Sequence, residues 1–575
     1  AAKKIPVVLS AEEVARIIEA APGPGLRYAL KNKGLNDPQI IHEPRLENRL
    51  GVKGFRPPPI GHDTIQGEKR ERVLPIRRFP DWQSCPECHV IQPAGQWAPT
   101  RSGDSLQCSS CSGKPSVLPV RFVTICENGH LNDFPWASWV PHSPKCNKQL
   151  LRLVTVGAGI SGLRVECMNC KETRSMGEAF SPNGIPGHFC QGGRPWLLDF
   201  QMGCKAPPRI TQRGASNVHF SVEESAISLP DWRSHFSDRL GAQKTVLDAI
   251  SDPAVLLPVV QAAVLPSWEG EETAAEIVQM ILDMRAMNED DQAADLRLPE
   301  FNMLCTDTSD IGSGTRELLN KKQEVPNPFD TKLKWVSAVE RLREVRALTG
   351  FTRLKAQVGG KPETVPLSRF PKDWLPGVQV HGEGIFIALN NDEVTKWEAT
   401  PGVRLHIETM LATYMSARMA EGDTPDGAPP ELTARYILVH TLAHALIATL
   451  SLESGYSSSA LRERLYVGNN MAGLLIYTST PDADGTMGGL SRQARKGRFD
   501  GLILQALANQ ELCSADPLCS EGLATSGANG NHAACHSCAF LPETSCEMFN
   551  SFLDRSLLSA GDLGFFSHWD DSAIL

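Results

Sequence analysis

Paired cysteines constrain this chain more than any other feature of its sequence. Cys85 and Cys88 form one C-x-x-C pair, and Cys108 and Cys111 form a second pair at the spacing of a zinc ribbon. Each pair directs two thiolates at one point, so the two pairs together supply the four sulfur ligands that suit tetrahedral structural Zn²⁺. These residues therefore predict a structural zinc site in a zinc-ribbon-like module.

The chain contains 16 cysteines, a number that would indicate disulfides in a secreted protein. Its first residues, AAKKIPVVLSAEEVARIIEAA, have neither the long apolar core nor the cleavage pattern of a secretory signal. We therefore expect a cytoplasmic protein whose thiols stay reduced and bind metal. A redox role for the first pair is disfavoured, because a second pair follows at ribbon spacing.

Two half-sites that mirror each other predict a second metal site. Cys126-x3-His130 is followed by His142-x3-Cys146, and two thiolates with two imidazoles complete a tetrahedral ligand set. Asp133 is placed to accept a hydrogen bond from a ligating imidazole. The alternative is that His142 lies on the surface and Cys146 serves the next site.

The cysteines that come next predict a third zinc site. Cys167-x2-Cys170, Cys190 and Cys204 offer four thiolates, and Cys146 could replace one of them. Gly and Pro are frequent in this part of the chain and hydrophobic periodicity is poor. Both properties are typical of a region in which metal ligation replaces a large apolar core.

A fourth group of cysteines follows near the end of the sequence. Its members are Cys513, Cys519, Cys535, Cys538 and Cys546. Five thiols exceed the four that a tetrahedral site needs, so one is spare, and Cys535-x2-Cys538 is the more secure half. Cys305 is assigned to the apolar core. All four sets are closed by protein ligands, which favours about three to four structural zinc ions over a catalytic one.

Length and hydrophobic periodicity predict several domains of mixed helix and strand. At roughly 150 residues per domain, 575 residues correspond to three or four domains. Ser10 and Glu13 resemble a capping box that begins a helix through Ala21. Apolar spacing predicts further helices over 271–287, 335–348, 403–420 and 433–453, and strands over 383–390 and 473–480.

The expected fold class is therefore α/β and multidomain. Zinc-ribbon-like modules precede a mixed α/β domain in the C-terminal part, which ends in another zinc-binding module. The expected regions are an N-terminal helix and basic arm (1–80), a zinc-binding region (81–220), a helical middle region (221–380), an α/β domain (381–510) and a C-terminal zinc module (511–575).

Two histidines lie one turn apart on the most apolar predicted helix. His440 and His444 share a face, as in the metal-binding half of H-E-x-x-H, but Thr441 replaces the glutamate that would act as base. With Glu453 as a third ligand they would give a metal-dependent hydrolase. The interpretation that we favour is that both are hydrogen-bonded core residues. Arg435 and the two rings fit a buried helix better than a membrane span.

Contacts to DNA must come from local patches, because the net charge of the chain is −9. One basic cluster lies in the Pro- and Gly-rich stretch 51–80, and a second follows a Gly-Gly pair. Their members are Lys69, Arg70, Arg72, Arg77 and Arg78, and Arg492, Arg495, Lys496 and Arg498. Either cluster could contact phosphate, and either is equally explained as a solvated loop.

The sequence contains no complete nucleotide-binding motif. Gly157-x-Gly159-x-x-Gly162 matches a dinucleotide fingerprint, but Cys167 follows too soon for the helix that should bind pyrophosphate. The sequence contains no G-x-x-x-x-G-K-[ST] string. We therefore expect that the chain does not hydrolyse ATP itself.

Longer runs of sequence resemble a known family. EGIFIALNNDEVTKWE, HTLAHALIATLSLESGYSSSALRERLY and MAGLLIYTSTPDADGTMGGL are similar to a C-terminal domain of unknown function that occurs in, or partners with, superfamily 2 helicases. The ending ADPLCSEGLATSGANGNHAACHSCAFLPETSCEMFNSFLDRSLL resembles the zinc module of MrfA-type repair helicases, and PVRFVTICENGHLNDFPWASWV also fits. With no helicase motor present, the chain resembles the DrmB family of the DISARM anti-phage system, over residues 80–220 and 380–560.

The resemblance implies a partner and a role. The partner would be a DrmA-like, helicase-like ATPase, and the pair would act on incoming unmodified phage DNA beside a methyltransferase. We therefore predict a non-catalytic, zinc-binding subunit that docks on this helicase and helps hold DNA. The rival hypotheses are a metal-dependent hydrolase that uses His440 and His444, and a free-standing DNA-binding protein.

Overall fold

The computed structural model describes residues 40–567 with internal gaps. The gaps are 58–60, 66–67, 73–77, 102–104, 181–184, 186–187, 231–239, 241–242, 251, 268–272, 276, 279–280, 282–294, 309–316, 357–363, 421–426, 428, 454, 479–488, 526 and 528. The helix predicted from Ser10 to Ala21, most of the helix predicted over 271–287, and Arg77 lie outside the described residues.

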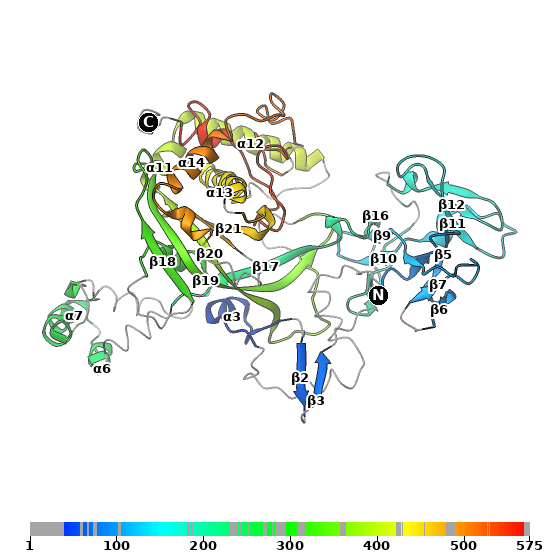
Figure 1. The fold of residues 1–575 in the computed structure, drawn as a ribbon, viewed down its shortest axis with the longest axis horizontal. Coiled ribbons are helices and arrows are strands. Elements are labelled where there is room, and N and C mark those ends of the chain that lie inside the picture. Colours follow the sequence, from blue (N-terminus) through cyan, green and yellow to red (C-terminus); the bar gives the residue numbers. More distant parts are fainter. Residues whose placement is uncertain are drawn as a thin grey trace.

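Two unlike parts make up the described chain. Figure 1 shows a body, in which helices cover a long curved sheet, and beside it a smaller part built of short strands. The smaller part comprises residues 81–219 and is called the cysteine lobe below. The chain enters the body before it forms the lobe, because β1 (Phe55–Arg56) pairs in parallel with β20 of the body sheet.

The body sheet has seven strands. They run in the order β17, β19, β20, β22 and β21, with β18 beside β19 and β1 beside β20. The bounds are β17 Phe220–Ile227, β18 Leu318–Gln323, β19 Leu333–Thr352, β20 Leu375–Leu389, β21 Leu461–Gly468 and β22 Met471–Thr478. The strands predicted over 383–390 and 473–480 are confirmed for 383–389 in β20 and 473–478 in β22, and residues 479–480 lie outside the described residues.

The helix predicted over 335–348 is wrong, because these residues lie within β19. Val336 packs under the helices on one face of the sheet, and Val339 packs into a different cluster with Phe386 and Tyr466. The register of β19 against β20 then shifts between Val339 and Leu342. Burial on both faces and an irregular register remove the two-residue alternation of an ordinary strand. The remaining apolar spacing of three residues imitates a helix.

The principal core lies where helices cover one face of the sheet. Helix α13 (Ala434–Glu453) is its centre and packs against β21, β22 and four other helices. The others on this side are α11 Asn391–Glu398, α12 Pro401–Ala420, α14 Phe499–Ala508 and α15 Ser556–Ser559. The helices predicted over 403–420 and 433–453 are thus confirmed.

Helix α13 is the one described helix that is long and apolar enough to cross a membrane, and 72% of its apolar window is buried inside the protein. Its position among the sheet and the neighbouring helices is that of a core helix (Figure 1).

The opposite face of the sheet carries further helices. Helix α10 (Arg297–Leu304) places Glu300 against Arg464 of β21, in a fully buried ion pair of 2.6 Å. Helix α3 (Pro44–Leu50) packs near β17. Helices α6 (Gln243–Asp248) and α7 (Pro253–Val259) belong to a separate apolar cluster, which Figure 1 shows at the far end from the cysteine lobe.

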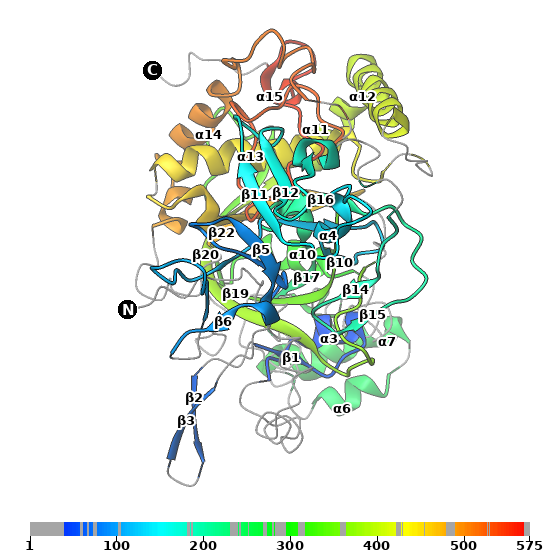
Figure 2. The same ribbon diagram turned by 90° about the vertical axis from the view of Figure 1, so that its right-hand side faces the viewer.

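The cysteine lobe is built mainly from two antiparallel sheets, which face the viewer in Figure 2, together with two pairs of short strands. One sheet has the strand order β13, β12, β11, β5, β4 and β8, and the other has β10, β9 and β16. The bounds are β4 Trp82–Ser84, β5 Val90–Pro93, β8 Leu118–Pro119, β9 Phe122–Ile125, β10 Leu131–Asp133, β11 Leu151–Thr155, β12 Leu163–Cys167, β13 Thr173–Ser175 and β16 Arg209–Gln212. Smaller elements are β6 Ala98–Pro99, β7 Leu106–Gln107, α4 Trp136–Trp139, β14 Gly193–Arg194 and β15 Asp199–Phe200.

Two sequence features fall into hairpins. The glycine run from Gly157 to Gly162 connects the antiparallel strands β11 and β12, so it forms a hairpin turn and not the start of a helix. In the basic stretch 51–80, β2 (Gly61–Ile65) and β3 (Glu68–Arg72) form a second hairpin that projects from the body (Figure 2).

The end of β19 joins the lobe to the body. Phe351 at this end shares an apolar cluster with Val123, Ile125 and Trp196 of the lobe. The buried guanidinium of Arg353 donates a hydrogen bond of 2.8 Å to the carbonyl of Gly129. It also lies 5.0 Å from the ring centroid of Trp196. One strand of the body sheet thus helps to hold the lobe in place.

Candidate metal centres

The first predicted set comes together in the structure. Cys85, Cys88, Cys108 and Cys111, the ribbon cluster, lie in the turns beside β4, β5 and β7, with all four sulfurs within 4.8 Å of one another. Three pairs of sulfurs are 3.8 Å apart. Ligands on a tetrahedral zinc with Zn–S bonds of about 2.3 Å lie about 3.8 Å apart, so this geometry fits zinc.

The second and third predicted sets exchange partners. Cys126 and His130 pair with Cys190 and Cys204, not with His142 and Cys146. We call these four residues the bridging cluster. The His130 ring turns Nδ1 toward the sulfur of Cys126 at 3.4 Å, and its Nε2 lies 3.0 Å from the side-chain oxygen of Gln201. A hydrogen bond at the outer nitrogen fixes the ring so that the inner nitrogen faces the metal position.

His142 and Cys146 join Cys167 and Cys170 to form the hairpin cluster. The expectation that Cys146 could serve this site is met, whereas His142 is not a free surface residue. The sulfurs of Cys146 and Cys167 lie 3.8 Å apart, and Nδ1 of His142 lies 3.5 Å from the sulfur of Cys170. Its Nε2 lies 2.9 Å from the carbonyl oxygen of Ala137, as expected of a ligating imidazole.

Sequence spacing missed this exchange because one cluster is nested within the other along the chain. Asp133 also has a different role from the one predicted. Its carboxylate accepts the backbone N–H groups of Asp81 and Trp82 at 3.1 and 3.2 Å, and so fixes the start of β4. Gln201 supplies the contact to imidazole instead, and no local sequence signal indicates it.

The terminal cluster resolves the surplus of cysteines near the C-terminal end. Cys513, Cys519, Cys535 and Cys538 come together, with sulfur–sulfur distances of 3.6, 3.7 and 3.8 Å. Cys546 is the spare thiol of this set. Asp516 accepts the N–H of Cys513 at 2.8 Å and pairs with Arg555 through both oxygens, which fixes the loop that carries Cys513.

Metal ligation requires the thiolate, and within the clusters the pKa values of neighbouring thiols shift in opposite directions, with those of Cys126 and Cys538 raised and those of Cys190 and Cys535 lowered. A hydrogen bond from Cys126 lowers the pKa of Cys190 to about 5. Burial raises the pKa of Cys535, but the N–H of Ser537 and the neighbouring cysteines outweigh it and lower the pKa to about 7. Cys305 lies outside these clusters, and burial raises its pKa to about 12.

The two histidines of α13 lie beside residues that are distant from them in the sequence. His440 and His444 lie beside Glu463 of β21 and Cys546, and all four side chains are buried. Glu453, the third ligand considered above, is exposed at the end of α13 and does not take part. We call these four residues the buried mixed cluster.

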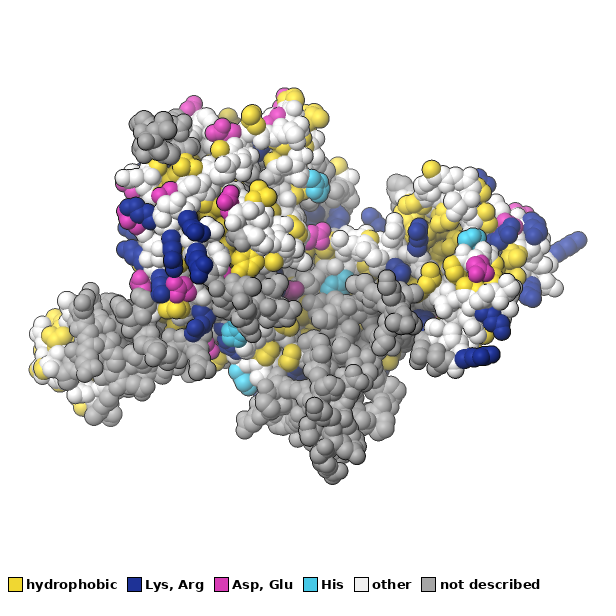
Figure 3. Space-filling model, in the orientation of Figure 1, with side chains coloured by type: hydrophobic (Ala, Val, Ile, Leu, Met, Phe, Trp, Pro, Cys, Tyr) yellow, Lys and Arg dark blue, Asp and Glu magenta, His cyan; other side chains and the backbone are white. Residues whose placement is uncertain are grey.

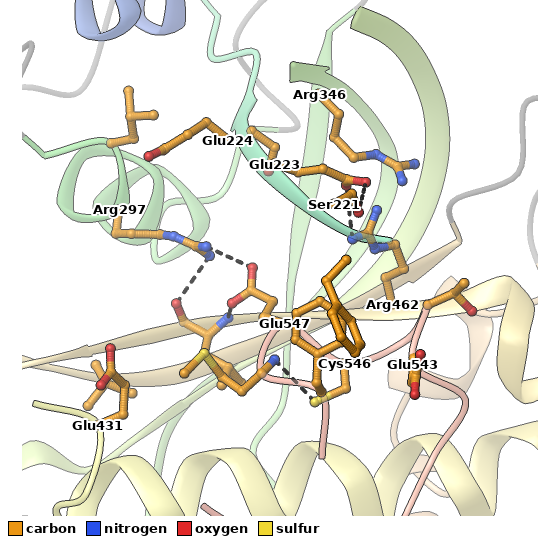
Figure 4. A pocket seen from close by; sticks show the side chains of 18 of the residues that line it. Ser221, Glu223, Glu224, Arg297, Arg346, Glu431, Arg462, Glu543, Cys546 and Glu547 are labelled. Atoms are coloured by element: carbon orange, nitrogen blue, oxygen red, sulfur yellow. Dashed lines mark hydrogen bonds and ion pairs between the residues drawn. The ribbon is translucent and has the colours of Figure 1, made fainter. Parts of the chain in front are cut away.

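A cavity of about 990 Å³ lies beside Cys546. Figure 4 shows charged side chains around it, with Arg297 directed at Glu547 and Arg462 beside Glu223. These pairs are separated by 2.7 and 3.6 Å, so the charges that line the cavity partly neutralise one another.

The second basic cluster is exposed and lies beside the body sheet. Arg492, Arg495, Lys496 and Arg498 occupy a short 3-10 helix, Ser491–Ala494, and the turn that leads into α14, and this helix packs on β19 and β20. Lys496 pairs with Glu324 at 2.6 Å. Figure 3 shows Lys and Arg side chains gathered at the edge of the body where β18 lies.

Comparisons with known proteins agree with the zinc assignment. Residues 17–220 match a domain of unknown function, DUF8724, and residues 442–539 match the MrfA Zn-binding domain. The second match contains the whole terminal cluster. Together with the thiolate-rich clusters, it identifies a zinc protein with three to four sites of this kind.

A curated protein is similar over most of its length. It is the DISARM protein DrmB of Bacillus paralicheniformis, which is 32% identical over 480 residues that cover 79% of this chain and 82% of the relative. The similarity therefore extends well beyond the zinc clusters, and the chain belongs to the DrmB family of DISARM proteins.

Proposed function

We propose that this chain is a non-catalytic, zinc-stabilised subunit that binds a helicase-like ATPase and helps to hold DNA during anti-phage defence. The observation that carries the proposal is the completeness of the ribbon, bridging, hairpin and terminal clusters. Each brings four protein ligands together, whereas a catalytic zinc keeps a position open for water or substrate. The DISARM relative supplies the defence context.

Contact with DNA is assigned to the exposed basic cluster on the body. Arg492 and Arg495 are exposed, so phosphate can reach both. Binding through such residues releases counterions from DNA and becomes weaker as salt rises.

The first test distinguishes a non-catalytic subunit of a complex from an enzyme that acts alone. The purified chain is mixed with the helicase-like ATPase of the same DISARM system, and complex formation and ATP hydrolysis are measured for each protein alone and together. We expect a complex, with ATP hydrolysis in the partner and none in this chain alone. Robust hydrolysis by this chain, or no complex at micromolar concentrations, would overturn the proposal.

The second test addresses DNA. The double variant R492A/R495A should weaken DNA binding by the complex and lower its salt slope by about two, because each lost phosphate contact removes about 0.9. K334A/R404A, which removes two other exposed basic side chains of the body, is the matched control and should leave the slope unchanged. Equal slopes for the two variants would assign DNA contact to another surface.

A further inference from the structure

The buried mixed cluster draws its residues from three distant parts of the body. His440 and His444 lie one turn apart on α13, Glu463 lies on β21, and Cys546 follows the terminal cluster in the chain. All are at most 4% exposed. Figure 4 shows Cys546 at the foot of the cavity, with its sulfur on the side of the helix below it.

The atoms of this cluster surround a common point at ligand spacing. Nε2 of His440 lies 3.2 Å from the sulfur of Cys546 and 3.1 Å from one oxygen of Glu463. Nε2 of His444 lies 3.6 Å from the other oxygen of Glu463. Nitrogen and oxygen ligands about 2.0–2.2 Å from a tetrahedral zinc lie at comparable separations from one another.

The surrounding hydrogen bonds leave the inner atoms free for a metal. Nδ1 of His444 lies 2.7 Å from the carbonyl oxygen of Ala539, so this nitrogen carries the proton and Nε2 has its lone pair free. The sulfur of Cys546 accepts the N–H groups of Met548 and Asn550, each at 3.3 Å. Such contacts orient and stabilise a thiolate ligand.

Two of the inner atoms have no hydrogen-bond partner among the described residues. They are Nε2 of His444 and the second carboxylate oxygen of Glu463, both fully buried, and the 3.6 Å between them is too long for a hydrogen bond. A buried polar atom without a partner is strongly disfavoured, and more so if it is charged. Because both atoms belong to the group of ligand atoms that lie within 4.8 Å of one another, they indicate a binding site for a cation.

Charge balance agrees with a divalent cation. One carboxylate and one thiolate carry two negative charges, and two neutral imidazoles add none, so a divalent ion makes the site neutral. Neutrality matters here because an unpaired charge is strongly disfavoured at full burial. Nitrogen, oxygen and sulfur donors in a four-ligand set suit Zn²⁺ best among the common divalent ions.

We propose that His440, His444, Glu463 and Cys546 bind a further zinc ion, in addition to those of the four thiolate-rich clusters. Binding releases the thiol proton of Cys546 to solvent. The site is structural, because four protein ligands fill the tetrahedral shell. Thr441, which stands where H-E-x-x-H has its base, accepts the backbone N–H of Asp554 at 3.0 Å, and a neutral hydroxyl is far too weakly basic to take a proton from water.

This zinc would join three segments of the chain, and the MrfA Zn-binding domain match contains only two of its four ligands. The match covers residues 442–539, so it begins after His440 and ends before Cys546. The carbonyl that orients His444 belongs to Ala539, next to Cys538 of the terminal cluster. The two sites would therefore support each other.

The experiment is a zinc count on the folded full-length chain. Zinc per chain is measured by elemental analysis and by native mass spectrometry for the parent, for Cys546→Ala and for Glu463→Gln. Cys305→Ala is the matched control, since Cys305 also packs in the body but lies outside every cluster named above. We expect each cluster variant to lose one zinc relative to the parent and the control to lose none.

Unchanged zinc in folded Cys546→Ala and Glu463→Gln would overturn the proposal. If both variants fail to fold, the zinc count of the parent chain becomes the test. Four zinc ions or fewer per chain would overturn the proposal, and more than four would support it. In the Co²⁺-substituted parent, Cys546→Ala should remove one part of the sulfur-to-metal charge-transfer absorption. An identical spectrum would also contradict the site.

Discussion

The strands of the larger sheet in the cysteine lobe are two to five residues long, whereas β19 and β20 of the body have 20 and 15 residues. Three metal clusters cross-link the loops of the lobe. The body instead buries one extensive apolar cluster around α13. Where strands are too short to enclose a large core, metal ligation supplies folding free energy at a few points, whereas the body distributes it over many contacts.

The largest effect should come from breaking a cluster in the lobe. Cys88→Ser removes one of the four ribbon sulfurs, and zinc binding of this kind contributes on the order of 10 kcal/mol to folding. We expect loss of one zinc per chain and complete loss of amide hydrogen-exchange protection over residues 82–119, with α13 unaffected. Cys305→Ser should change neither. Retained protection in zinc-depleted Cys88→Ser would show that the lobe has a sufficient apolar core of its own.

A core truncation in the body should have a smaller effect that is spread over the whole body. Leu442 is fully buried in α13, and Leu442→Ala should lower the free energy of unfolding by about 2–5 kcal/mol. Zinc in the ribbon cluster should stay bound. Leu452→Ala, on the same helix but 81% exposed, is the control for chemical denaturation. Release of the ribbon zinc by Leu442→Ala would mean that the two parts unfold as one.

The smallest effect should arise where the two parts meet. Arg353→Met keeps the aliphatic contact but leaves the carbonyl of Gly129 without its donor, at a cost of about 1–3 kcal/mol. We expect faster hydrogen exchange over residues 123–133, with the denaturation midpoint of the body almost unchanged. The exposed Arg404→Met is the comparison. A lower midpoint for the whole body would show that this junction also stabilises the body sheet.

The same comparison shows what could be predicted from the sequence. The grouping of the four ribbon cysteines was predicted correctly, because both C-x-x-C turns are local and adjacent. The helices α12 and α13 and the strands β20 and β22 were also predicted correctly, since their apolar patterns are long. The prediction at β19 failed because the strand is buried on both faces, as at Val336 and Val339, and this burial hides the two-residue alternation of a strand.

Long-range partners could not be predicted from spacing. Cys190 completes the bridging cluster although a whole hairpin cluster intervenes in the chain. Glu463 meets His440 only because β21 packs against α13. An ordinary glutamate in a strand gives no sign of this contact, and Cys546 was assigned to the nearest cysteines because they are closer in sequence.

The nesting of the hairpin cluster inside the bridging cluster sets an order of assembly during synthesis. All four hairpin ligands leave the ribosome before Cys190, which follows His130 by 60 positions. At about 5–20 residues per second, Cys126 and His130 wait roughly 3–12 s for Cys190, and somewhat longer for Cys204. Metal that binds during translation therefore completes the hairpin cluster first, and the bridging cluster forms around a segment that is already folded.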